Sequence, residues 1–236
     1  LSVTVLVLQA LASAYSALEA EEKKKGVVLM DIVAGVTDII VYYNNAVYYT
    51  GTMNLAGDMV TNDISILTGI STENAEKIKL AYGYATKDVI STEETYNIEG
   101  MSGRQSLTVT NVQLSEYINA RLEEILRECQ KEALNSDITK NLEPVVCLCG
   151  GTSLFRGFEH VADSLFSSSP LAPNLTRIGL PTGFTGENIK ELTSPEYTAL
   201  IGLLKFAADK KGDSIYKKLK KTANLWEKFK RLIDKF

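Results

Sequence analysis

A short turn between two apolar strand segments sets the limits on how this chain can fold. Residues 31–39 read DIVAGVTDI, and apolar segments at 26–30 and 39–43 lead into and out of the turn. A strand–turn–strand with an aspartate at each end can meet a phosphate or a phosphate-bound metal, because bare backbone N–H groups bind anions and carboxylates order hydrated magnesium. The turn has one glycine, and side chains occupy the other positions where a phosphate loop needs bare backbone: Val33, Ala34 and Val36. The segment is a working nucleotide loop, a degenerate one or an ordinary hairpin.

Strand and helix signals alternate along the rest of the chain. Asn44-Asn45 predicts a hairpin turn before a third strand at 46–54, Ser71 and Asn111 are expected to cap helices, and Pro195 fits a first helical turn. The predicted helices are 57–68, 71–83, 112–135, 153–166 and 195–208, and the further strands are 95–98, 106–109, 145–151 and 176–180. This alternation predicts an α/β fold.

The cysteines and the histidine carry no clear chemistry. Three cysteines are an odd count, which fits a reducing compartment better than a disulfide framework. Cys147 and Cys149 alternate on an apolar run and are expected on one face of a buried strand, with no clustered partners for a metal. His160 is expected in a helix as a surface or packing residue, so we predict neither a metal site nor a catalytic one.

The N-terminus resembles a signal peptide only in part. An apolar stretch precedes Ala12-Ser13-Ala14, but no initiator methionine or basic leader comes before it. A strand at 3–8 and a helix at 10–24 stopped by Gly26 explain the same residues. No stretch reaches transmembrane length. We therefore expect a chain that starts within a fold, as a fragment or a shortened gene product would.

The C-terminal segment differs in charge from the body. Residues 210–236 carry ten basic and three acidic residues, a surplus of seven, and since the whole chain carries −4, residues 1–209 carry −11. An acidic body does not favour nucleic-acid binding over the whole surface, whereas the basic segment indicates an anionic partner of its own.

A helix over this segment would be amphipathic. Its apolar face would hold Ile215, Leu219, Trp226, Phe229, Ile233 and Phe236, and its flanks Lys217, Lys218, Lys220, Lys221, Lys228, Lys230 and Arg231. Such a helix lies in the interface of an anionic bilayer, where each basic residue adds about 1 kcal/mol that salt weakens. A helix docked on its own domain and a two-stranded coiled coil are the alternatives. The hinge at 210–212 and the dense basic face favour the membrane.

Three ordered motifs resemble the second lobe of the actin-like ATPase superfamily. They are the strand–turn–strand with two aspartates, the helix with Ala75-Glu76 and Lys79, and a strand ending in Gly150-Gly151. Four segments (ALASAYSALEAEEKKKGVVLMDIVAGVTDIIVY, AEKIKLAYGYA, CLCGGTSLFRGFEHVADSLF and YTALIGLLKFA), together with the basic terminus, are similar to the FtsA family of bacterial cell-division proteins. The resemblance covers residues 5–209.

The resemblance implies a nucleotide site and assigns individual residues to it. Asp31 matches the acidic residue near the metal, and Gly35 and Thr37 match phosphate-contacting positions of a loop that reads Asp-Ile-Gly-Gly-Gly-Thr-Thr-Asp in the family. Glu76 and Lys79 match the pair that lines the adenosine. The adenosine loop corresponds to Gly150, Gly151 and Thr152.

The departures from the family pattern weaken that site. Val33, Ala34 and Val36 replace two glycines and a hydroxyl, and a Cβ at such positions blocks close approach and can forbid the backbone angles needed. The lobe with the first phosphate loop is expected to be missing, because nothing precedes Leu1. We expect ATP and magnesium binding that is weak or absent, no hydrolysis, and apolar cleft surface around Met30 and Val33 that causes marginal solubility or dimerisation.

The resemblance implies a non-catalytic adaptor at the cytoplasmic face of the membrane, at the division septum. It would recruit the FtsZ polymer by binding the FtsZ C-terminal peptide. The alternatives are an actin-like ATPase whose first lobe is absent, and a related pilus-assembly protein. Self-association is a further expectation, because actin-like lobes stack into filaments, although a filament usually needs both lobes.

The resemblance also implies the domain organisation. A larger ribonuclease-H-like subdomain would comprise residues 1–56 and 142–209, and a smaller α/β subdomain, residues 57–141, would be inserted into it. Residues 210–236 would form the amphipathic membrane-targeting helix.

Overall fold

A computed structural model describes residues 6–98, 107–139, 142, 144–168, 171, 175–184 and 189–209. The first part of the chain forms α1 (Gln9–Ala17), α2 (Ala20–Lys25), β1 (Val27–Ile32), β2 (Thr37–Tyr43), β3 (Ala46–Met53), α3 (Gly57–Thr68), α4 (Thr72–Tyr82), η1 (Lys87–Val89), β4 (Thr95–Ile98), β5 (Leu107–Thr110) and α5 (Asn111–Ala133). The second part forms β6 (Val145–Cys149), η3 (Gly151–Leu154), α6 (Phe158–Phe166), β7 (Leu175–Ile178), α7 (Ile189–Leu192), η4 (Pro195–Tyr197) and α8 (Thr198–Ala208).

Within the described residues, a five-stranded mixed sheet has the order β3-β2-β1-β6-β7. β1 pairs antiparallel with β2 and parallel with β6, and β7 continues the parallel side. β2 and β3 form the predicted hairpin around Asn44 and Asn45, whose φ angles are +50° and +61°. Asparagine tolerates this left-handed region better than most residues, which explains the turn.

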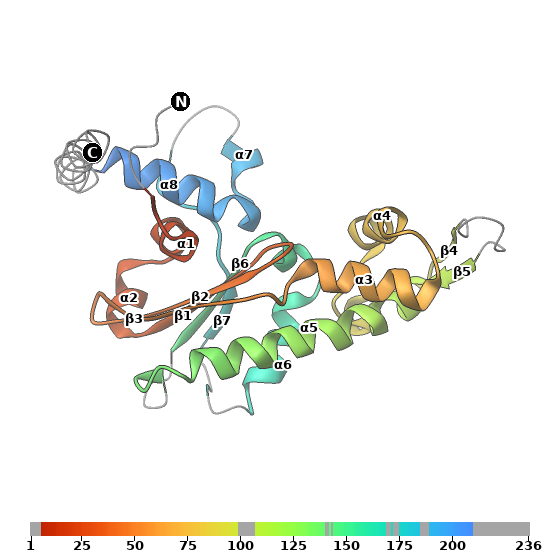
Figure 1. Ribbon diagram of the computed structural model, residues 1–236, viewed down its shortest axis with the longest axis horizontal. Helices are drawn as coiled ribbons and strands as arrows, with labels where there is room; N and C mark the ends of the chain where they lie inside the picture. Colours follow the sequence, from red (N-terminus) through yellow and green to blue (C-terminus); the bar gives the residue numbers. More distant parts are fainter. Residues whose placement is uncertain are drawn as a thin grey trace, which may run out of the picture.

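Helices cover both faces of the sheet (Figure 1). One face packs against α3, α5 and α6, and its cluster includes Met30, Ile118 and Phe158. The other face packs against α1, whose alanines meet Leu29 and the cysteines of β6. Cys147 and Cys149 do share this face, as expected, and burial raises the pKa of both thiols, that of Cys147 to about 12. Strands and helices in alternation confirm the α/β class.

The helices α3 and α4 and the hairpin β4–β5 lie at one end of the long axis, away from α1, α2 and the C-terminal end of α8 (Figure 1). The long helix α5 joins this end to the sheet, with Ile118, Leu122 and Ile125 fully buried. These elements fall within residues 57–141. The subdomain boundaries stay a prediction.

Several local predictions were wrong. Helix 10–24 is two helices, because Leu18 and Glu19 are extended and Glu19 opens α2 in a capping box with Glu22. Thr110, not Asn111, caps α5 in a capping box with Gln113. The helix expected from 153 begins at Phe158, after the 3-10 turn η3.

Two further predictions fail at the sheet and the N-terminus. Met30 is fully buried under the helices, so it adds nothing to an exposed cleft face. Leu6–Leu8 have no strand structure and residues 3–5 lie outside the described ranges.

The predicted amphipathic tail, residues 210–236, lies outside the described residues. Among the helices that are described, none is long and apolar enough to cross a membrane. His160 is on α6, with 60% of its side chain exposed, and its Nε2 lies 3.8 Å from an Asp88 carboxylate oxygen.

The packing of α8 on α1 gives a first prediction. A Cβ on Gly202 would lie 1.7 Å from the carbonyl oxygen of Ala12, so Gly202→Ala forces the two helices apart. Although alanine favours a helix by about 1 kcal/mol over glycine, overpacking against backbone should lower the free energy of unfolding by at least about 2 kcal/mol. Urea unfolding measures it. Leu200→Ala, on the exposed face of α8, is the control with little expected change; equal stability of wild type and Gly202→Ala would contradict this packing.

Candidate functional site

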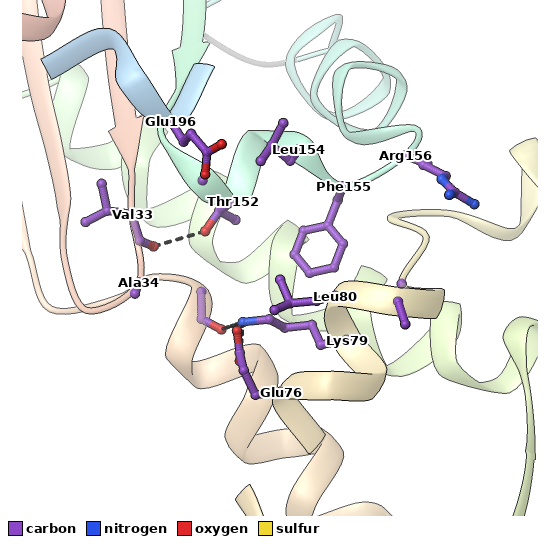
Figure 2. Close-up of a pocket in the computed structure, with 14 residues that line it drawn as sticks. Val33, Ala34, Glu76, Lys79, Leu80, Thr152, Leu154, Phe155, Arg156 and Glu196 are labelled. Atoms are coloured by element: carbon purple, nitrogen blue, oxygen red, sulfur yellow. Dashed lines mark hydrogen bonds and ion pairs between the residues drawn. The ribbon is translucent and has the colours of Figure 1, made fainter. Parts of the chain in front are cut away.

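A cavity of about 220 Å³ opens where the turn after β1, α3, α4, η3 and η4 meet. Its apolar walls are Leu80, Leu154 and Phe155, and Figure 2 shows the Phe155 ring directly opposite Leu80. The polar lining comes from Glu76, Lys79, Thr152, Arg156 and Glu196. Because pockets for drug-sized ligands enclose about 300–1,000 Å³, this smaller cavity suits a group no larger than a nucleobase or nucleoside.

The Glu76–Lys79 pair on α4 is satisfied within the protein. The Lys79 ammonium is 2.6 Å from the Glu76 carboxylate and donates hydrogen bonds to Thr61 Oγ1 (2.8 Å) and to the Gly57 carbonyl (3.4 Å). Only 8% of the lysine side chain is exposed. Three acceptors around one ammonium leave it little capacity to bind a further anion.

The protonation of Glu76 follows from the same contacts. Partial burial raises the pKa of Glu76, but the hydrogen bonds from Lys79 and Thr61 outweigh burial and hold it below its ordinary value. Glu76 is therefore ionised at neutral pH. With Glu196 on the opposite wall, the charged lining comprises two carboxylates, Lys79 paired with Glu76, and Arg156, whose guanidinium donates a hydrogen bond to the Tyr84 hydroxyl at 2.8 Å.

The turn after β1 is tied to the cavity floor by its carbonyl groups. The Val33 oxygen accepts hydrogen bonds from the Gly57 amide (3.0 Å) and from Thr152 Oγ1 (3.0 Å, dashed in Figure 2). The Ala34 oxygen accepts from the Asp58 amide at 2.8 Å. Because these bonds occupy the first amides of α3, that helix start is not free to bind a phosphate.

The side chains in this turn cause no backbone strain. The Val33 amide donates to the Val36 carbonyl at 3.1 Å and closes the turn. None of the turn residues has a positive φ, so Val33, Ala34 and Val36 adopt this turn without strain, and the effect of their Cβ atoms on phosphate binding stays a prediction. Their steric effect remains, because Val33 and Ala34 line the cavity.

Asp31 faces away from the cavity, towards α1. One carboxylate oxygen accepts hydrogen bonds from Ser13 Oγ (2.6 Å) and Gln9 Nε2 (3.3 Å). The other oxygen, Oδ1, is buried and has no hydrogen-bond partner among the described residues. Burial raises the pKa of Asp31, and the bonds from Ser13 and Gln9 oppose that rise. Sequence reasoning missed these two partners, whose one signal is their polarity within an otherwise alanine-rich helix.

The structure thus brings together half of the predicted nucleotide residues. Glu76, Lys79, Gly151 and Thr152 line the cavity, whereas Asp31, Gly35, Thr37 and Gly150 do not. Thr37 is buried and donates to the Leu55 carbonyl at 2.6 Å. Gly150 has a φ of +85°, and a Cβ there would lie 2.4 Å from the Ile32 carbonyl oxygen, so its glycine serves the packing of β6 on β1. The four predicted residues that line the cavity all belong to the predicted adenosine positions, whereas the predicted metal and phosphate positions lie outside its lining.

Comparisons with known proteins identify relatives of the chain. The family model for cell division protein FtsA matches residues 28–202. FtsA of Pseudomonas aeruginosa is 31% identical over 215 residues, which are 91% of this chain and 50% of that protein. FtsA of Bacillus subtilis is 32% identical over 207 residues, 88% of this chain and 44% of that protein. The chain spans about half the length of the curated relatives it matches.

Solved structures show the same fold at lower sequence identity. MreB5 of Spiroplasma citri bound to ADP superposes with a TM-score of 0.67 at 17% identity, over 92% of this chain and 62% of that one. A PilM–PilN type IV pilus biogenesis complex gives a TM-score of 0.57 at 21% identity, over 84% of this chain and 51% of that one. The fold is therefore an actin-like lobe, as expected.

The buried Asp31 gives a prediction on pH. Because its folded pKa is raised, the folded state holds this proton more tightly than the unfolded one, so its contribution to stability is full at acidic pH and is lost as pH rises through the folded pKa. Asp31→Asn, neutral throughout, should gain stability relative to wild type as pH increases from about 4 to 7. Urea unfolding across that range measures the difference.

A second variant tests the cause. Ser13→Ala removes a hydrogen bond that lowers the pKa of Asp31. This pKa should therefore rise further, and the loss of stability should extend to higher pH. A difference between wild type and Asp31→Asn that is the same at every pH would show that the carboxyl does not titrate in this range.

Proposed function

Because the chain belongs to the FtsA family of cell division proteins, we propose that it acts as a membrane-tethered adaptor that recruits the FtsZ polymer to the division septum. The observation that carries the proposal is the family match over residues 28–202 followed by a basic amphipathic segment at 210–236. The protein would work at the cytoplasmic face of the cell membrane.

The geometry of the lobe supports this role. The last described residues, at the end of α8, and the hairpin β4–β5 lie at opposite ends of the long axis (Figure 1). A segment that follows α8 into the bilayer would therefore leave α3, α4 and β4–β5 pointing away from it. We assign the FtsZ C-terminal peptide to the smaller subdomain, residues 57–141, which this orientation presents to the cytoplasm.

We propose that the nucleotide site is degenerate. ATP and magnesium would bind weakly, with the base between Leu80 and Phe155, and no hydrolysis would follow. Three observations support this: the Lys79 ammonium is paired with Glu76, Asp31 is turned towards α1, and Val33 and Ala34 carry side chains at the cavity edge. An intact loop would recognise the phosphate charges of a bound nucleotide. This chain would contact the nucleotide mainly through residues around its nucleoside part.

An actin-like ATPase that works with a second lobe is the alternative from another class of function. The likeness to nucleotide-bound MreB5 concerns the fold alone. A pilus-assembly role has the same kind of support from the PilM–PilN structure. The basic amphipathic segment favours the adaptor over both.

The tail prediction is tested with vesicles of phosphatidylglycerol and phosphatidylcholine. The full chain should sediment with them at low salt and release as salt increases, because each basic residue contributes about 1 kcal/mol that salt screens. A chain ending at Lys210 should stay in the supernatant. Vesicle-bound full chain should then recruit FtsZ, and the FtsZ C-terminal peptide should compete for it. Equal sedimentation of both chains would remove the tail from this role.

The loop prediction is tested by restoring the family residues. The triple variant Val33→Gly, Ala34→Gly, Val36→Thr should bind MgATP at least about tenfold more tightly than wild type, because the amide of residue 34, no longer screened by Cβ atoms, and the added hydroxyl can each contribute a hydrogen bond of about 1 kcal/mol. Isothermal titration calorimetry measures binding, and phosphate release measures hydrolysis. Tight MgATP binding by the unaltered chain would contradict degeneracy.

A further inference from the structure

One end of the lobe concentrates positive charge and exposed apolar side chains. The last turn of α2 is Lys23-Lys24-Lys25, and Lys24 and Lys25 are exposed. The β2–β3 hairpin beside it exposes 42% of Val47 and 50% of Tyr48. We call the surface formed by Lys23, Lys24, Lys25, Val47, Tyr48 and Lys205 the basic end surface.

Backbone hydrogen bonds join two parts of this surface, α2 and the β2–β3 hairpin. The Asn44 amide donates to the Lys24 carbonyl at 3.0 Å, and the Asn45 amide donates to the Lys23 carbonyl at 2.9 Å. The hairpin tip is therefore tied to α2. The Tyr43 and Tyr48 rings pack edge to face, 5.9 Å apart, which holds the exposed tyrosine in place.

A tyrosine joins the same surface to the end of α8. The Lys23 ammonium lies 5.7 Å from the Tyr15 ring centre and the Lys205 ammonium 5.9 Å from it. The Tyr15 hydroxyl donates a hydrogen bond to Asp209, the last described residue before the basic segment. The last described residue is thus linked through Tyr15 to Lys23, one of the lysines of α2.

We propose that the basic end surface is a second membrane contact, which lies flat on anionic lipid headgroups while the tail enters the bilayer. This inference rests on the proposed function, because the tail brings the surface to the membrane. Lysines attract anionic headgroups and an exposed tyrosine with an apolar neighbour suits the interfacial layer. On a body with a net charge of −11, a cluster of four lysines at the exit of the tail selects the orientation that faces lipid.

The acidic residues of α2 restrict its positive charge to the C-terminal end of this helix. Glu22 is paired with Arg177 at 2.6 Å, but Glu19 and Glu21 are exposed on the first turn. The contact therefore depends on the last turn of α2 and the hairpin facing the bilayer. In this pose the long axis of the lobe stands away from the membrane, with α3 and α4 at the far end (Figure 1).

Orientation is measured on the full chain with a fluorophore at one cysteine. The native cysteines are buried, so a surface cysteine reacts selectively. Ala46→Cys places the label at the exposed hairpin, and Ile66→Cys places it at the exposed end of α3. On phosphatidylglycerol–phosphatidylcholine vesicles with nitroxide headgroups, we expect quenching at Ala46→Cys and little at Ile66→Cys. Equal quenching of both labels, or of neither, while the chain sediments would overturn the surface and leave the tail function standing.

Charge reversal supplies the matched test. Lys24→Glu with Lys25→Glu should weaken vesicle binding at low salt roughly tenfold to thirtyfold, and the loss should shrink at high salt. Lys77→Glu with Lys87→Glu changes net charge equally at exposed lysines away from this surface and should have a much smaller effect. Circular dichroism checks folding, with Lys24→Gln and Lys25→Gln as the milder pair. Equal effects of the two reversals would show attraction by net charge alone, and a full chain that never sediments would remove the tail function and this surface together.

Discussion

The burial of β1 holds the two halves of the molecule together. All its residues are at most 1% exposed, although successive side chains point in opposite directions. Val28, Met30 and Ile32 enter the cluster under α3, α5 and α6, while Val27 and Leu29 enter the cluster with α1. A shift of one residue would exchange these sets, so the pairings with β2 and β6 fix the positions of both helical layers. The cavity, the turn and the start of α3 are placed by the same strand.

Much of the sheet could be predicted because its signals are local. Asn44-Asn45, the apolar run of β6 and the periodic face of α5 each depend on a few neighbouring residues. The errors came where a local signal competes with a tertiary one. The stop signal at Gly26 suggested a continuous helix from Ala10, but the Glu19–Glu22 capping box starts a second helix, and the 3-10 turn η3 after Gly150 precedes α6.

The candidate site was half predictable for a related reason. Motif positions located Glu76, Lys79, Gly151 and Thr152, since spacing along a helix or loop determines which residues meet. They did not reveal that Asp31 turns towards Ser13 and Gln9, because α1 reaches β1 only through the packing of the second core. Nor could they show that Lys79 is already satisfied by Thr61 and Glu76. Partners on distant segments decide whether a matched residue can meet a ligand.

The exposed position of His160, the one histidine of the chain, has a consequence for control in the cell. Histidine is the side chain that most often changes charge between pH 5 and 8, and here it lies on α6 rather than beside the lysines of α2 or the lining of the cavity. A change in pH over this range would therefore leave the charge of those lysines nearly constant. In the proposed membrane contact, attachment would follow the lipid composition of the membrane and the ionic strength, so the protein would respond to where anionic lipid gathers and not to swings in acidity.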